Sequence, residues 1–86
     1  MSAKEGKLKS LHKSEKMYEL LQAPDGKLLL DVVVGTIALY TARLQLDEGE
    51  RKKYQERGIA FLDELAADVV KNEPRYREQG RTRPVD

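Results

Sequence analysis

The most apolar stretch of the chain, LLLDVVVGTIALY, covers residues 28–40 and is interrupted by one aspartate and one glycine. Five β-branched residues fall within six positions of this stretch, between Val32 and Ile37. Such side chains lose rotamer freedom in a helix and pack well on a pleated sheet. The stretch therefore predicts β-structure rather than a buried helix.

Gly35 marks the expected reversal of the chain. A glycine at the first central position of a two-residue loop permits a type II′ turn, so we expect a tight hairpin between strands at about 27–34 and 37–46. In this register Asp31 lies opposite Tyr40. The alternative is a single bent strand in which Gly35 forms a bulge and all pairing occurs between two chains.

The two faces of the expected hairpin differ in polarity. One face is entirely apolar and should carry the helices: Leu28, Leu30, Val32, Val34, Ile37 and Leu39. The other face mixes apolar residues with charge: Lys27, Leu29, Asp31, Val33, Ala38, Tyr40, Ala42 and Leu44. It is too apolar for plain exposure to water, which makes Leu29, Val33, Asp31 and Tyr40 candidate interaction residues.

Beyond residue 46 the apolar spacing changes to that of an amphipathic helix, over about 47–72. Asp47 followed by Glu50 resembles a capping box, and its carboxylates lie near the positive end of the helix dipole. One helix face then carries a stripe of apolar residues and one glycine: Tyr54, Gly58, Phe61, Leu62, Leu65 and Val69, widened by Ile59, Ala66 and Val70. Asn72 is the expected C-terminal stop, with Pro74 just beyond it.

A shorter helix is expected over SEKMYELLQ, residues 14–22, with Ser14 as its cap, or from an earlier start near Lys7. The expected fold is therefore α+β, a small α-β-β-α domain in which an antiparallel β-hairpin packs on a long C-terminal amphipathic helix. The chain forms one domain, 1–86, in which 1–10 and 78–86 are expected to be mobile basic arms.

The size of the chain limits what it can bury. A domain of 86 residues has a thin core, and small domains usually need disulfides, a metal or oligomerisation in addition. Cysteine is absent and His12 is the single histidine, so disulfides, thiolate nucleophiles and Cys- or His-rich metal sites are excluded. Oligomerisation remains, and a homodimer is the expected state.

The net charge of +1 hides an uneven layout. The local charge is +3 over residues 1–16, −3 over 47–70 and +2 over 71–86. The C-terminal arginines are therefore further candidate interaction residues: Arg75, Arg77, Arg81 and Arg83. Basic termini can bind nucleic acid through its phosphates. The chain is almost neutral, however, and few aromatic residues lie among its basic ones, which does not favour that role.

Neither a membrane nor an export pathway is indicated. Only eleven uncharged residues separate Asp31 from Arg43, whereas a spanning helix needs about 20. The first ten residues contain no apolar stretch of signal-peptide length, so a cytoplasmic protein is expected.

Few residues suggest chemistry. Asp31 in its apolar setting is a sharper candidate acid or base than His12. The competing interpretation of Asp31 is an open-face residue bonded to Tyr40 or paired with an arginine, within one chain or across a dimer. His12 is expected to be an exposed side chain on a basic helix. Three acids, Asp63, Glu64 and Asp68, are expected on a solvated helix face rather than around a metal.

These observations predict no catalytic, cofactor or metal site. The favoured function is a non-enzymatic protein–protein interaction module or small homodimeric accessory protein. One specific version is an inhibitor of the immunity or antitoxin type, since such proteins are short and charged. The alternatives are a nucleic-acid-associated accessory protein that uses the basic termini, and an acid–base enzyme built around Asp31.

Overall fold

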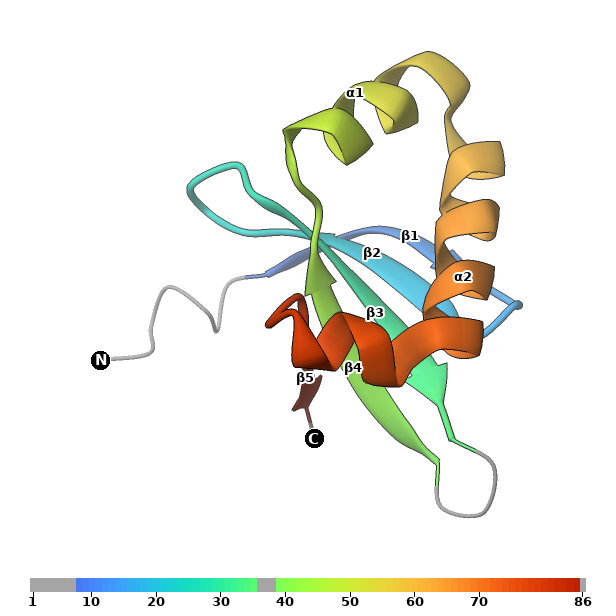
Figure 1. Ribbon diagram of the computed structural model, residues 1–86. Helices are drawn as coiled ribbons and strands as arrows, with labels where there is room; N and C mark the ends of the chain where they lie inside the picture. Colours follow the sequence, from blue (N-terminus) through green and yellow to red (C-terminus); the bar gives the residue numbers. More distant parts are fainter. Residues whose placement is uncertain (1–7, 36–38, 86) are drawn as a thin grey trace.

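The computed structural model describes residues 8–35 and 39–85. Within them the chain forms an α+β domain built from one antiparallel sheet and two helices (Figure 1). In chain order the elements are β1 (Lys9–Ser14), β2 (Tyr18–Gln22), β3 (Leu28–Val34), β4 (Tyr40–Gln45), α1 (Glu48–Arg57), α2 (Ile59–Glu78) and β5 (Thr82–Val85).

The five strands lie in the sheet in the order of the sequence, and every neighbouring pair is antiparallel. Helix α2 crosses one face of this sheet, so that face becomes the core (Figure 1). Strand β3 shows the result most clearly, since its side chains alternate between buried and half-buried along its whole length. This period of two is what a strand covered on one face requires.

Turn chemistry fixes the connection between β2 and β3. The sequence APDG forms a tight turn in which the Gly26 N–H donates to the Ala23 carbonyl over 2.9 Å. The Asp25 carboxylate accepts a further bond from the Lys27 N–H at 3.1 Å. The turn expected from the sequence at this position is confirmed.

Helix α1 begins with the capping box that its sequence predicts. The Glu50 N–H donates to the Asp47 side chain at 2.8 Å, and the Asp47 N–H donates to the Glu50 side chain at 2.9 Å. Helix α2 supplies the apolar surface that covers the sheet, through Phe61, Leu62, Leu65, Ala66 and Val69.

The C-terminal part of α2 is fixed by one buried carboxylate. Glu73, only 3 % exposed, accepts hydrogen bonds from the Tyr40 hydroxyl at 2.8 Å, the Arg77 Nε at 3.0 Å and the Thr82 hydroxyl at 3.2 Å. These partners come from β4, α2 and the start of β5. The Arg77 guanidinium, followed by the Tyr40 hydroxyl and Thr82, holds the pKa of Glu73 below its usual range against the opposing effect of burial.

The expected helix at 14–22 is wrong. The chain there forms the end of β1, a turn and β2, and His12 accordingly lies on a strand. The side chains of Tyr18 and Leu20 point into the core, which is the spacing of a strand. The turn contains no glycine; Met17 itself adopts a φ of 68°, so the usual sequence signal for a reversal is missing.

The expected register of the central hairpin is also wrong. Val34 pairs with Tyr40 and Asp31 pairs with Arg43, so the connection is longer than two residues. The register differs by three positions from the expected one, and an odd shift exchanges the two faces of a strand. Ala42 and Leu44 are therefore buried and Tyr40 faces the helix; the expected turn residues Thr36 and Ile37, with Ala38, lie outside the described residues.

The pairing of β3 with β4 within one chain excludes the single bent strand. The apolar face expected for the first strand is confirmed, because Leu28, Leu30, Val32 and Val34 are all buried.

The helical region and the tail differ from expectation as well. The helix expected over 47–72 is broken at Gly58 and continues past a non-helical Asn72 to Glu78. Ile59 and Val70, expected on its buried face, are exposed. The last residues were expected to be mobile, but Thr82–Val85 pair with β4 as a fifth strand, whereas residues 1–7 lie outside the described part.

Gly58 joins the two helices in a conformation that L-residues avoid, with φ 67° and ψ −141°. Gly58→Ala should lower the free energy of unfolding by about 1–3 kcal/mol, measured by urea denaturation. The cost should be backbone strain alone, because a Cβ there would meet no atom within 4 Å.

Gly49→Ala is the matched control for this change. Gly49 lies inside α1, where an added Cβ would make only an ordinary 3.6 Å contact. It should raise the stability by about 0.4–1 kcal/mol. Equal effects of the two substitutions would contradict the assignment of strain to Gly58.

Glu73→Gln should lower the free energy of unfolding at pH 7 by about 1.5–3 kcal/mol, since it removes the charged acceptor of several hydrogen bonds. The pKa of Glu73 is lowered in the folded state. Its stabilisation is therefore complete above about pH 4.5 and disappears as the pH falls through the folded pKa.

The stability difference between wild type and Glu73→Gln should consequently narrow in acid, as measured by urea denaturation across pH 2.5–7. Glu78→Gln, an exposed change on the same helix, should stay within about 0.5 kcal/mol of wild type. A difference that is independent of pH would refute the role of the Glu73 charge.

Candidate functional site

The candidate site is the face of the sheet that the helices leave uncovered, here called the open face. It carries the side chains that alternate with the buried ones on the central strands. From β3 and β4 these are Leu29, Asp31, Val33, Thr41, Arg43 and Gln45. All except Gln45 are half-buried although no helix lies on them, because they shelter one another.

Asp31 and Arg43 form the centre of the open face. They lie directly opposite each other on β3 and β4. The Arg43 Nε donates to one Asp31 carboxylate oxygen at 2.7 Å, and Nη2 donates to the other at 2.9 Å. The Arg43 side chain is 16 % exposed and the Asp31 side chain 15 %. A bidentate pair of this kind fixes the positions of both side chains more firmly than a solvated surface pair does.

This ion pair belongs to a longer line of charges. The strand registers place five charged residues side by side across the whole sheet: Lys13, Glu19, Asp31, Arg43 and Arg83, one from each strand in order. We call this line the charged row. The next residues along the strands are less polar, with Leu21 and Leu29 on one side of the row and Val33, Thr41 and Val85 on the other.

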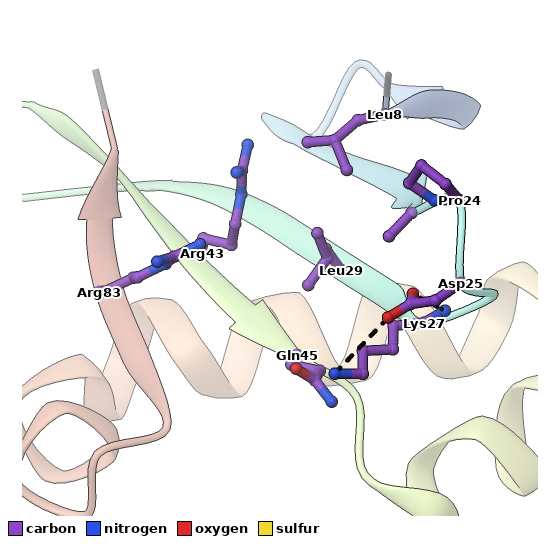
Figure 2. A pocket seen from close by; sticks show the side chains of 9 residues that line it. Leu8, Pro24, Asp25, Lys27, Leu29, Arg43, Gln45 and Arg83 are labelled. Carbon is purple, nitrogen blue, oxygen red and sulfur yellow. Dashed lines mark hydrogen bonds and ion pairs between the residues drawn. The ribbon is translucent and has the colours of Figure 1, made fainter. Parts of the chain in front are cut away.

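One end of the open face is hollowed. Figure 2 looks onto this hollow, with the helices lying behind the sheet, and shows Leu8, Leu29, Arg43 and Arg83 around it. Its volume is about 520 Å³. The β2–β3 turn adds Pro24, Asp25 and Lys27 to the wall, and Lys27 is paired there with Asp25. The hollow is open, mixed in polarity and rich in cations.

The structure brings together only part of the expected set of interaction residues. Leu29, Asp31 and Val33 share the open face, as expected for the first strand. Tyr40 lies on the other face, where its hydroxyl donates to Glu73 and accepts from the Arg77 guanidinium. The expected contact between Asp31 and Tyr40 is therefore absent, and Arg43 takes its place.

The four C-terminal arginines are spread over different surroundings. Arg77 binds Glu73 and Arg81 binds Glu50 at 2.6 Å, so both serve the fold. Arg75 is exposed in the last turn of α2. Arg83 alone among them reaches the open face, where it is exposed beside Arg43.

The other titratable groups have structural partners. The Tyr18 hydroxyl donates to Asp63 at 2.5 Å and Lys16 pairs with the same carboxylate at 3.0 Å, which joins β2 to α2. Burial, with the bond to Asp63, raises the pKa of Tyr18 to about 12. His12 lies 6.0 Å from the Tyr18 ring, measured between centroids. Glu64 binds Arg57, and Asp68 accepts from Asn72 and Tyr76.

Across residues 8–35 and 39–85, no group of three histidine or acidic side chains is placed to hold a metal ion. In the same part of the chain, no helix has the length and apolar character needed to cross a membrane.

Sequence reasoning missed Arg43 and Glu19 as members of the site. A signal for Arg43 was present, because Tyr40 to Leu46 alternates strictly between polar residues and apolar or aromatic ones. That alternation places Arg43 on the polar side of its strand, facing away from Ala42 and Leu44. Glu19 carries no comparable signal, because the residue pattern of 14–22 predicts a helix.

Comparisons with protein-family models, with curated proteins and with solved structures found no match to this chain.

Proposed function

We propose that the protein is a non-enzymatic protein-binding module and that the open face of its sheet is the binding surface. The observation that carries this proposal is the combination on that face of half-buried apolar side chains with an ordered, bidentate Asp31–Arg43 pair. Arginine is enriched in protein interfaces, and half-buried apolar side chains such as Leu29 and Val33 supply the apolar area that an interface buries.

The layout of the face supports binding more than acid–base chemistry. Both oxygens of Asp31 accept from Arg43, so this carboxylate serves an ion pair. Tyr40, the expected companion of an Asp31 acid–base site, lies on the opposite face of the sheet. A proton-transfer site needs its groups within reach of one substrate, and these two are separated by the sheet.

The layout also supports a protein partner more than a nucleic acid. Arg77 and Arg81 are neutralised by Glu73 and Glu50. The cations of the charged row flank two adjacent acids, Glu19 and Asp31, which would repel a phosphate backbone. A protein surface, which itself carries both signs of charge, fits such a row better.

Site-specific photo-crosslinking in the native cell tests this proposal. A benzophenone side chain at Gln45, which is exposed on β4, should yield a discrete adduct, because it projects from the open face. The same probe at Ala60, exposed on α2, is the control and should yield none. The readout is the mass and identity of the adduct.

The proposal fails if the Gln45 position yields no adduct, or if both positions give the same adducts. An adduct of twice the chain mass identifies a second copy as the partner, and one of another mass identifies a different protein.

A further inference from the structure

We propose that the partner on the open face is a second copy of this chain, packed face to face about a two-fold axis that runs parallel to the strands between β3 and β4. This inference rests on the proposed function, because it names the occupant of the same surface. It depends on the order of charges in the charged row, which complements itself under that rotation.

The complementarity follows from the strand positions. A two-fold axis between β3 and β4 brings each β3 over the partner's β4 and each β2 over the partner's β5. Asp31 then meets Arg43 of the partner subunit, and Glu19 meets the partner's Arg83. Every contact in this part of the row is between opposite charges, and the two intrachain Asp31–Arg43 pairs join into one four-charge network.

The other in-plane arrangement is unfavourable. A two-fold axis along the row itself would place each strand over its own copy, so that Glu19, Asp31, Arg43 and Arg83 would each meet an identical charge. Like charges placed together in a partly desolvated interface cost free energy and select against that geometry. The charge order therefore specifies one orientation.

The apolar residues beside the row fit the same arrangement. Met17, which directly precedes β2, accepts a hydrogen bond at its carbonyl from the Val33 N–H at 3.0 Å, and it is 53 % exposed. The rotation places Met17 over the partner's Val85, and Val33 over the partner's Thr41. An exposed methionine and two half-buried valines would thus be covered by the second copy.

The available area suits a weak dimer. The rotation covers four of the five strands, β2 to β5; at about 4.8 Å per strand and five to six residues of about 3.3 Å each, they give a face of about 19 by 18 Å. Side-chain relief enlarges the accessible area beyond this projection, to about 400 Å² per copy. The total of about 800 Å² is typical of weak, transient interfaces, so we expect dissociation constants in the high micromolar range.

The edges of the sheet are less suitable for pairing than its face. The edge strand β1 carries Lys9 and Lys13 and has an irregular register between Ser10 and His12. The other edge strand, β5, contains Pro84. Lysines, bulges and prolines are the features with which proteins protect sheet edges from association.

A charge exchange between Glu19 and Arg83 tests the inference. Neither side chain has a hydrogen bond or ion pair within residues 8–35 and 39–85, and the two residues stand three strands apart, about 14 Å, so they do not pair within one chain. Arg83→Glu alone and Glu19→Arg alone should each weaken dimerisation at least tenfold. The double variant should return to within about threefold of wild type, because it restores opposite charges across the interface.

The measurement is sedimentation equilibrium of the full chain from 1 µM to 1 mM in 50 mM salt, with urea denaturation to confirm that every variant folds. Arg75→Glu is the charge-matched control, since Arg75 is exposed on α2 and should leave dimerisation unchanged. The rescue by the double variant is the supporting result.

Three outcomes would overturn the inference: a monomer throughout this range, a double variant no better than the single ones, or an equal effect of Arg75→Glu. If the chain is monomeric and the Gln45 crosslink captures a different protein, the second copy is rejected while the binding function of the open face stands. If the crosslink also fails, both are rejected.

Discussion

The structure depends on one constraint, which is that this chain has enough apolar side chains to cover one face of its sheet and not two. Helix α2 supplies the cover, through a stripe from Phe61 to Val69, and the buried side chains of β2, β3 and β4 meet it. Everything on the opposite face has to be stabilised by its own neighbours. The Asp31–Arg43 pair does this at the centre, where two charges satisfy each other between two apolar margins. The open face is therefore both ordered and partly apolar, because the described part of the chain has no further apolar element to pack on it.

The parts of the fold that the sequence predicts are those in which local pattern and burial agree. The strand from Leu28 to Val34, the APDG turn, the capping box at Asp47 and the stripe on α2 each carry a signal that does not depend on distant residues. The segment 9–22 carries no such signal. Its lysines and glutamates favour a helix, β1 has a single aliphatic residue, Leu11, and the reversal uses Met17 rather than glycine. Pairing with β3 makes β2 a strand, and that contact is nonlocal.

The site shows the same division. Leu29, Asp31 and Val33 could be assigned to one face from their alternation alone, and the structure places them there. Their partners on β4 could not, because a register that differs by three positions turns every side chain of the second strand to the other face. The alternation from Tyr40 to Leu46 predicts the observed faces of β4, whereas the turn preference of Gly35 predicts the opposite ones. The sequence identifies Arg83 only as one of several basic residues. Its position beside Arg43 depends on strand β5, and a strand of four residues that includes a proline is not predicted by its own sequence.

The C-terminal strand connects the thin core to the open face. Glu73 accepts hydrogen bonds from the hydroxyls of Tyr40 and Thr82. The buried carboxylate thereby holds the end of α2 against β4 and positions the first residue of β5. The next residue, Arg83, then points to the opposite side of the sheet, since successive residues of a strand alternate. The charge at the far end of the charged row is in this way placed by a hydrogen-bond cluster on the other face. Weakening the cluster should therefore disturb the row without altering any of its five charges, which links the stability of this small domain to the surface through which we propose it binds.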